Sequence, residues 1–293
     1  MGERSVSGRS PAEGPAVLIT GCSSGIGRAA ALALAEAGFT VFATVRKESD
    51  AAALRGLGLP DLVPVCPVDL VDQHQVARAV TVVAGELERR GKNGLYGLVN
   101  NAGGSAPAPV ELLDPDIFHK ELQTRVLGSV GLVRAVLPLL RRAEGRIVWI
   151  MTPALIPTPY VASIHACDFA VNCLARTLDI ELGRWGIPNI MIRCGGIRTP
   201  AGSRTAADVE ALLRSRPADR VPLYEEALRK WAKDMEAFDR KRTEPERVAE
   251  VVVRALKANR PKRRYSVGHM ARAAAFLEFL PQSVADRILK KRF

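Results

Sequence analysis

Aromatic residues are scarce in this chain and make up 5% of its 293 residues. Proteins that recognise nucleic-acid bases usually stack them on aromatic side chains beside a basic patch. The 42 Lys and Arg residues exceed the 31 acids and give a net charge of +11, but they are scattered along the chain and form no basic arm. We therefore expect no nucleic-acid partner, and we assign the positive field to an anionic cofactor or substrate.

The chain also lacks a disulfide framework, a long apolar run and an apolar leader. Its five cysteines include no CxxC pair, which indicates free thiols in a reducing compartment and no metal site. No stretch approaches the roughly 18 apolar residues that span a bilayer, so no stable membrane insertion is expected. Residues 1–13 are polar and predict a disordered N-terminal tail without a signal peptide. Together these absences predict a cytoplasmic protein.

What the chain has is an alternation of short apolar runs and longer helical patterns. The runs are rich in Val, Ile and Leu and predict buried parallel strands at Ala16–Thr20, Thr40–Val45, Leu62–Val68, Gly97–Val99, Arg146–Met151 and Asn189–Arg193. The helical patterns between them include Gly25–Ala37, Asp72–Arg90, Phe118–Arg142 and Ala166–Trp185. This alternation predicts an α/β fold over residues 14–293: a single Rossmann-type, doubly wound parallel sheet with helices on both faces.

The C-terminal third departs from this alternation. Residues 199–243 are charged and helical and predict a helical lid over the substrate. A helix near Glu244–Ala258 and a strand at Arg264–Val267 complete the predicted sheet. The tail, 270–293, carries an apolar face that favours a docking or oligomer helix over a membrane-surface helix. We therefore expect a homodimer or homotetramer.

A glycine-rich turn joins the first predicted strand to the first predicted helix. It reads Thr20-Gly21-Cys22-Ser23-Ser24-Gly25-Ile26-Gly27. Gly21 permits a tight turn, Gly25 lets the backbone approach a pyrophosphate, and Gly27 permits close packing of helix on strand. The free N–H groups of the helix N-terminus then face the phosphates. The turn predicts a dinucleotide site.

The end of the second predicted strand indicates which dinucleotide is bound. Folds that prefer NAD place an acid there for the ribose 2′-hydroxyl, whereas NADP binders place an Arg nearby. This chain has Arg46 and Lys47 at that point and no acid at the strand end. With Ser23 they could hold a 2′-phosphate, which favours NADP(H); a solvated basic turn is the alternative.

The chain resembles the short-chain dehydrogenase/reductase superfamily in two motifs. One is the glycine-rich turn, which has the pattern TGxxxGxG, and the other is Asn100-Asn101-Ala102-Gly103 after the fourth predicted strand. The similarity extends over nearly the whole chain. It implies that Asp69 holds the adenine amino group, that Asn100 lies by the adenosine ribose and that Thr199 contacts the carboxamide or diphosphate. It also implies that the cofactor site includes a further set of residues: Ser23, Ser24, Ile26, Ala102, Gly103 and Gly195.

The same resemblance implies a Ser, a Tyr and a Lys that perform the chemistry, helped by an Asn. Alignment through the flanking segments places Arg125 at the Asn, Thr152 at the Ser, Ile164 at the Tyr and Asp168 at the Lys. Ile164 cannot transfer a proton and Asp168 cannot act as the cation, so the ordinary mechanism is absent in this register. A rival register places Tyr160 at the Tyr, but the Lys is lost there as well.

Arg125 and Asp168 are expected to form a direct pair. This pair is either a structural salt bridge or a device that binds or polarises a charged substrate, with Asp168 also accepting a hydrogen bond from the nicotinamide ribose. His165, on the same helix, is a candidate proton donor. More commonly, such a histidine is hydrogen-bonded within the protein or lies at an interface between subunits.

These features predict an NADPH-dependent reductase of a small, already activated acceptor, such as an iminium or a conjugated system. A related hypothesis is a cyclase in biosynthesis, since the loss of the same residues resembles fungal reductases of this superfamily that also act as Diels–Alderases. One alternative is a non-catalytic NADP(H)-binding subunit or sensor. The other is an ordinary alcohol or ketone oxidoreductase that uses Tyr160.

Overall fold

The structure is a computed structural model that describes residues 14–104, 107–200, 204–215 and 219–292. Its centre is a seven-stranded sheet in the order β3-β2-β1-β4-β5-β6-β7, and every pairing is parallel. The strands are β1 Ala16–Ile19, β2 Thr40–Thr44, β3 Leu62–Val65, β4 Gly97–Asn100, β5 Arg146–Met151, β6 Asn189–Cys194 and β7 Arg264–Val267. The predicted doubly wound α/β fold is therefore confirmed.

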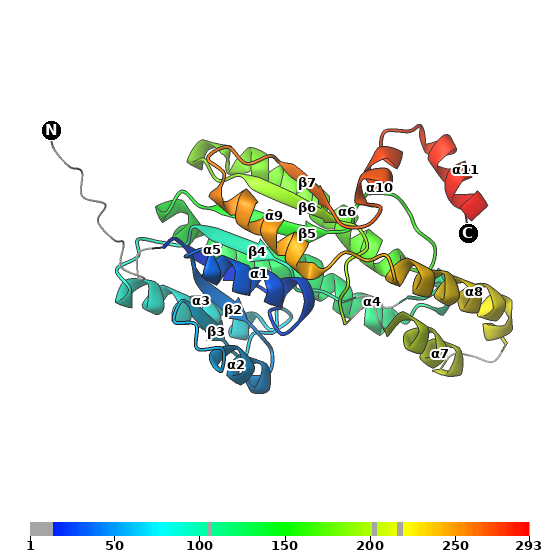
Figure 1. Cartoon of the computed structure of the whole chain (residues 1–293), viewed down its shortest axis with the longest axis horizontal. Coiled ribbons are helices and arrows are strands. Elements are labelled where there is room, and N and C mark those ends of the chain that lie inside the picture. The colour runs from blue at the N-terminus through cyan, green and yellow to red at the C-terminus, as the bar shows by residue number, and fades with distance from the viewer. Residues whose placement is uncertain (1–13, 105–106, 201–203, 216–218, 293) are drawn as a thin grey trace.

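Helices cover both faces of this sheet (Figure 1). One layer contains α3 (Gln73–Arg89), α5 (Ser129–Arg142) and α6 (Ala162–Glu181). The other contains α1 (Gly25–Glu36), α2 (Glu48–Arg55) and α9 (Pro245–Lys257). Successive residues of a strand point to opposite faces, so Leu18 joins the core of the first layer and Val17 that of the second. Burial on both faces explains why the strands read as continuous apolar runs.

The structure corrects one of the predicted helices in a way that matters for the site. The helix predicted at Phe118–Arg142 begins earlier, as α4 (Pro115–Leu122), where the Asp114 carboxylate accepts the N–H of Asp116 and Pro115 occupies the first turn. A π-helical turn, η3 (Gln123–Gly128), then separates α4 from α5. Such turns occur mostly within longer helices and frequently at functional sites.

The helix predicted at Ala166–Trp185 also has different bounds. It starts four residues earlier, at Ala162, and ends at Glu181 before a short 3₁₀ turn at Gly183–Trp185. Its N-cap residue, Val161, makes no side-chain capping bond. Without a capping signal the sequence pattern gave no indication of the earlier start.

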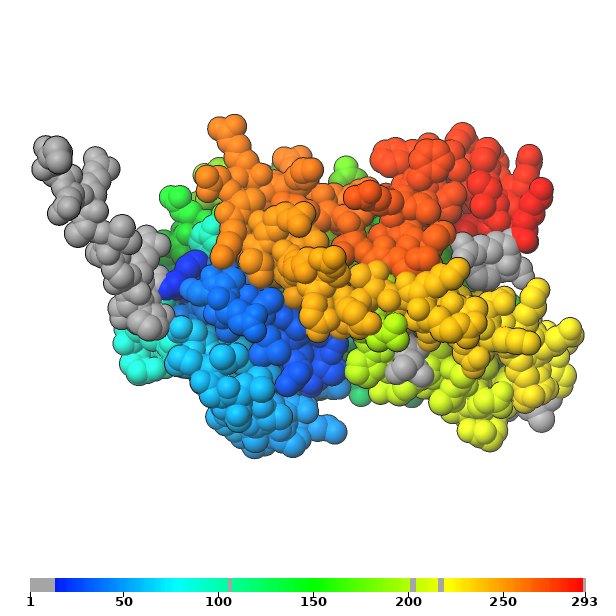
Figure 2. Space-filling view, viewed as in Figure 1, coloured from blue at the N-terminus to red at the C-terminus, as the bar shows by residue number. Residues whose placement is uncertain are grey.

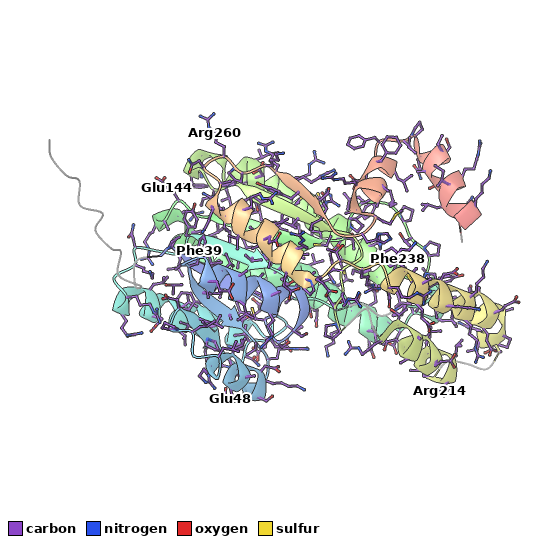
Figure 3. The ribbon with its side chains drawn as sticks, in the orientation of Figure 1. Phe39, Glu48, Glu144, Arg214, Phe238 and Arg260 are labelled. Atoms are coloured by element: carbon purple, nitrogen blue, oxygen red, sulfur yellow. The ribbon has the colours of Figure 1, made fainter. Side chains whose placement is uncertain are left out.

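Two helical segments lie at the same end of the molecule (Figures 1 and 2). The predicted lid contains α7 (Thr205–Ser215) and α8 (Val221–Asp239), which pack through a small apolar cluster that includes Val209, Leu228 and Trp231. Phe238, near the end of α8, lies toward the C-terminal segment in Figure 3, and its ring centroid is 5.1 Å from that of His269.

The C-terminal segment consists of α10 (Ala271–Leu277) and α11 (Gln282–Arg292). Phe276, Phe279, Val284 and Ile288, four residues of the predicted apolar face, are exposed. The chain itself therefore covers this face only in part. None of the helices in the described ranges is both long and apolar enough to cross a membrane. The tail predicted at residues 1–13 lies outside the described residues.

Candidate functional site

The predicted site residues gather where the parallel strands end. The turn after β1 and the loops after β4, β5 and β6 all lie at the carboxyl edge of the sheet, and their order 1-4-5-6 makes them neighbours. Strand order reverses direction between β1 and β4, which is where open α/β sheets hold their ligands.

The three glycines of the β1–α1 turn have distinct roles. Gly21 and Gly25 adopt positive φ angles of 73° and 55°, which side chains rarely accept. A Cβ atom on Gly27 would lie 2.1 Å from the Gly21 carbonyl oxygen, so only glycine fits there. A Cβ atom on Gly25 would lie 3.2 Å from Cγ2 of Thr199. The fold thus brings Thr199, predicted from the loop after β6, against the turn.

Hydrogen bonds tie this turn to the loop after β4. The Thr20 hydroxyl oxygen accepts the N–H groups of Asn101 at 2.9 Å and Ala102 at 3.0 Å. The Asn101 side-chain amide donates back to the Thr20 carbonyl at 2.9 Å. Thr20 and Asn101 were not predicted as site residues, although both lie within the two motifs. Their role is to hold the two predicted cofactor loops in register.

The β1–α1 turn and the end of β4 carry polar groups without hydrogen-bond partners in the described structure, and these groups fit a dinucleotide. The N-cap residue Ser24 makes no side-chain capping bond, and the first turn of α1 contains no acid. The helix dipole and its free N–H groups therefore favour an anion. Both polar atoms of the Asn100 side chain are buried without a hydrogen-bond partner among the described residues. Buried amides normally have partners, so an external ligand is the natural one.

The outer end of the predicted cofactor site is exposed. Arg46 and Lys47 follow β2 after the buried Val45, and both are exposed. The acid nearest to them in sequence, Glu48, pairs with Arg55. Asp69 is half-buried after β3, and one of its carboxylate oxygens accepts the Val71 N–H at 3.1 Å.

Arg125 lies in the π-helical turn η3 and reaches over the loop after β4. Its guanidinium donates to the Gly104 carbonyl, with Nη2 at 2.7 Å and Nε at 3.2 Å. A Cβ atom on Gly103 would lie 2.6 Å from the guanidinium carbon. The absent side chain at Gly103 is what allows Arg125 to lie flat on this predicted cofactor loop.

Asp168 is buried on α6, with 2% of its surface exposed. One carboxylate oxygen lies 3.5 Å from Nη1 of Arg125, so the expected direct pair is present. The other oxygen accepts the backbone N–H of Thr152 at 2.7 Å. The Thr152 hydroxyl is buried and has no hydrogen-bond partner within the described ranges. The structure therefore brings Arg125, Asp168 and Thr152 together beside the predicted cofactor loop.

The two registers for the missing Tyr occupy different places. Ile164 lies on α6, one turn before Asp168. Tyr160 precedes the helix, with a φ of 66°, and its ring packs edge-on against Trp231 of α8 at 5.7 Å between centroids. Tyr160 thus contacts the predicted lid.

His165 is half-buried on α6, three residues before Asp168. Burial lowers the pKa of this imidazole, and the nearby Asp168 carboxylate opposes part of that effect. The neutral ring is favoured over the imidazolium, and it makes a hydrogen bond to the backbone of Ile156. Nδ1 is buried without a partner among the residues that the structure describes.

Two further charged residues were not predicted. Arg193 on β6 is fully buried, and its guanidinium lies 3.5 Å from the carboxylate of Glu278, which follows α10. No local signal marks this pair, because a strand residue and a tail residue 85 positions apart meet only in the fold.

Gly195, predicted as a cofactor residue, packs against the His269 carbonyl, where an added Cβ atom would lie at 2.1 Å.

Residues 15–210 match the family model described as short chain dehydrogenase. Among curated proteins, the chain is 29% identical to 3-amino-tetrahydro-pyrrolizinone reductase of Xenorhabdus hominickii, over 87% of each chain. It is 30% identical to human 11-beta-hydroxysteroid dehydrogenase type 2, over 97% of this chain and 72% of the relative.

Solved structures resemble the fold over most of its length. A short-chain dehydrogenase from Streptomyces avermitilis superposes with a TM-score of 0.74 at 22% identity and covers 95% of this chain and 96% of its own. One from Burkholderia cenocepacia, determined in complex with NADP, has a TM-score of 0.72 at 22% identity, over 95% and 98% of the two chains. These likenesses concern the fold.

Proposed function

Because the chain belongs to the short-chain dehydrogenase family, we propose that it is an NADPH-dependent reductase whose acceptor is already activated, as an iminium or a conjugated system is. One observation carries this proposal: the buried Asp168 pairs with Arg125 beside the predicted cofactor loop, and the sequence alignment assigns these two residues to the family's Lys and Asn. An acceptor that needs no proton from a Tyr would make the loss of that residue tolerable.

NADPH, when bound, supplies the hydride. The β1–α1 turn and the N-terminus of α1 would bind its diphosphate through backbone N–H groups. The open amide of Asn100 would bind the adenosine ribose, and Asp69 the adenine amino group. Arg46 and Lys47 would pair with the 2′-phosphate at the exposed end of β2.

The remaining side chains would position the acceptor. A cationic C=N group beside the buried Asp168 carboxylate is stabilised by a charge that needs no reorganisation. The unpartnered Thr152 hydroxyl and the unpartnered Nδ1 of His165 can hold a polar group of the acceptor. The reductase from Xenorhabdus supports this direction, since its named substrate, a pyrrolizinone, is a nitrogen heterocycle.

Cofactor preference tests the first half of the proposal. NADPH should bind at least about tenfold more tightly than NADH, because a charge-assisted pair with Arg46 contributes about 1.4 kcal/mol or more. Arg46→Ala should remove that preference while leaving NADH affinity unchanged. Fluorescence titration of both cofactors measures it, and equal affinities in the parent protein would refute the assignment.

A screen of acceptors tests the second half. Iminium and enone compounds should consume NADPH, and simple secondary alcohols should not be oxidised with NADP⁺. Ring formation without consumption of NADPH would favour the cyclase hypothesis. Tight NADPH binding without turnover of any acceptor would favour the sensor hypothesis.

We further propose a homodimer through the surface of α5 and α6. Ile180 on α6 is 82% exposed. A hollow of about 470 Å³ between the same two helices is lined by Leu137, Leu178, Leu182 and Trp185 and by three charged residues, and Ile180 is not among its lining residues. A second copy that covers this apolar surface would remove it from water. Ile180→Asp should then shift the mass measured by light scattering to that of a monomer.

A further inference from the structure

Arg193 carries a positive charge in the interior of the protein. None of its surface is exposed, and burial lowers the pKa of its guanidinium. Its Nη2 donates to the side-chain oxygen of Asn172 on α6 at 2.9 Å. Its Nε and Nη1 are buried without a hydrogen-bond partner in the described part of the chain. A neutral amide alone does not balance a buried cation, so nearby carboxylates must do so.

Two carboxylates act on this cation. Glu278 lies 3.5 Å from Nη1 of Arg193, and Asp168 acts on it electrostatically; both favour its charged form, whereas Arg264 opposes it. Asp168 already forms an ion pair with Arg125 and accepts a hydrogen bond from the Thr152 N–H. The charges therefore alternate from the candidate site to the C-terminal segment: Arg125, Asp168, Arg193, Glu278 and Arg264.

Glu278 makes two further contacts besides the one with Arg193. Its Oε2 lies 2.8 Å from Nη1 of Arg264 on β7, and its side chain is 12% exposed. Its Oε1 also accepts the backbone N–H of Leu155. Leu155 lies in the loop between β5 and α6, three residues after Thr152. Glu278 thus contacts a buried cation and the loop that carries part of the candidate site.

We propose that Glu278 is a positioning residue for the candidate site: it balances the buried charge of Arg193, so that the Asp168 carboxylate remains with Arg125 and Thr152. If the Glu278 charge is removed, Asp168 is the remaining carboxylate that favours the charged form of Arg193. Asp168 would then move toward Arg193 and weaken its bonds to the other two residues. The proposal rests on the proposed function only for its effect on turnover.

Glu278→Gln isolates the charge, because the amide oxygen of Gln can still accept the Leu155 N–H. Amide hydrogen exchange should show at least about tenfold faster exchange at Thr152, whose N–H bonds to Asp168. Exchange at Leu155 should change by less than about twofold, since its acceptor remains. On an acceptor that the parent protein reduces, kcat should fall at least about tenfold while the KM for NADPH stays constant.

Arg193→Met added to Glu278→Gln removes both charges. This double variant should restore the protection of Thr152 and most of kcat, which a merely structural loss would not do. Glu250→Gln, an exposed acid of α9 paired with Arg247, is the matched control and should change neither quantity.

Unchanged exchange at Thr152 in Glu278→Gln would overturn the proposal, as would a double variant that remains as impaired as the single one. If the single variant does not fold, a folded double variant with parental protection at Thr152 still supports it, and an unfolded double variant overturns it. Because hydrogen exchange needs no substrate, this result stands even if the proposed reductase activity is refuted.

Discussion

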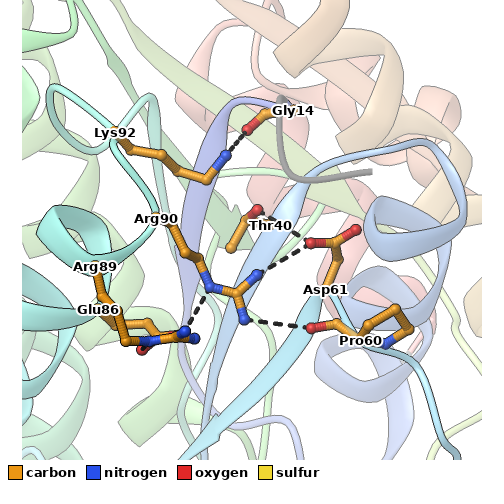
Figure 4. Close-up of polar contacts among 8 residues, drawn as sticks. All are labelled: Gly14, Thr40, Pro60, Asp61, Glu86, Arg89, Arg90 and Lys92. Atoms are coloured by element: carbon orange, nitrogen blue, oxygen red, sulfur yellow. Dashed lines mark hydrogen bonds and ion pairs between the residues drawn. The ribbon is translucent and has the colours of Figure 1, made fainter. Parts of the chain in front are cut away.

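Charged side chains cluster at both ends of the sheet, and the two clusters differ in how their polar atoms are paired. At the amino end, Arg90 joins Glu86 at 2.6 Å, Asp61 at 3.1 Å and the Pro60 carbonyl at 3.3 Å (Figure 4). At the carboxyl end, the Arg125–Asp168 and Arg193–Glu278 contacts are both 3.5 Å.

The two clusters also differ in their open polar atoms, although Nε of Arg146 and Nδ2 of Asn189, at the amino ends of β5 and β6, are buried without a partner among the described residues as well. In the described structure, Thr152, His165 and Arg193 at the carboxyl end each have a buried polar atom without a partner, whereas Arg90, Glu86 and Asp61 have none. A cluster whose polar atoms are all paired has no free donor or acceptor for a ligand, so we expect it to contribute to stability alone. The carboxyl-end cluster keeps donors and acceptors available, which is what a binding site requires.

Neutralising one acid in each cluster should separate the two roles most clearly. Asp168→Asn should lower turnover of the accepted substrate by about 100-fold, because it removes a preorganised charge from the site. NADPH affinity should change little, whereas the melting temperature should fall, because Arg125 loses its buried counter-charge. Glu86→Gln is the counterpart at the amino end and should leave turnover unchanged. Full activity of Asp168→Asn would reduce its ion pair to a structural one.

The amino-end cluster should instead show its effect in stability. Arg90→Met should lower the free energy of unfolding by about 2 kcal/mol, because it leaves Asp61 and the Pro60 carbonyl without their charged donor. Urea denaturation measures this change. Arg247→Met, in an exposed pair on α9, should cost less than about 0.5 kcal/mol. Equal costs for the two variants would remove the distinction between this fully paired cluster and a surface pair.

Acid should weaken the amino-end cluster within a defined window. Arg89 and Arg90 lower the pKa of Glu86 from 4.5 to about 2. Because the folded-state pKa is depressed, the contribution of Glu86 is fully present above pH 4.5 and is lost as the pH falls toward about 2. Urea denaturation of the parent protein across this window should show the loss, and Arg90→Met should flatten it. Curves that stay parallel would indicate that another group dominates.

The smallest expected effect concerns Tyr160, which borders the carboxyl-end cluster. Tyr160→Phe should change turnover by less than about threefold, since its ring packs on Trp231 and the variant keeps that ring. Loss of a general acid would cost about 10²–10⁴-fold. A loss of that size would assign the chemistry to Tyr160 and support the rival register.

The sequence by itself determined the sheet, its helices and the cofactor turn. These depend on local signals: short apolar runs predict strands buried on both faces, and the spacing of Gly21, Gly25 and Gly27 reports backbone geometry within one turn. The family register also placed Arg125 and Asp168 close together, and the structure brings them to 3.5 Å. Helix bounds were less accurate, because α6 begins without a capping side chain.

Only the tertiary structure decided how these side chains are oriented and which carboxylate meets the buried Arg193. Arg125 lies flat on Gly103 because η3 directs it there, and Tyr160 packs against the lid because the chain turns at a positive φ before α6. Arg193 and Glu278 meet because the C-terminal segment returns past β7 to the carboxyl end of the sheet. No periodicity or motif encodes such a meeting, since the two residues share neither a helix nor a strand and become neighbours only when the sheet is complete.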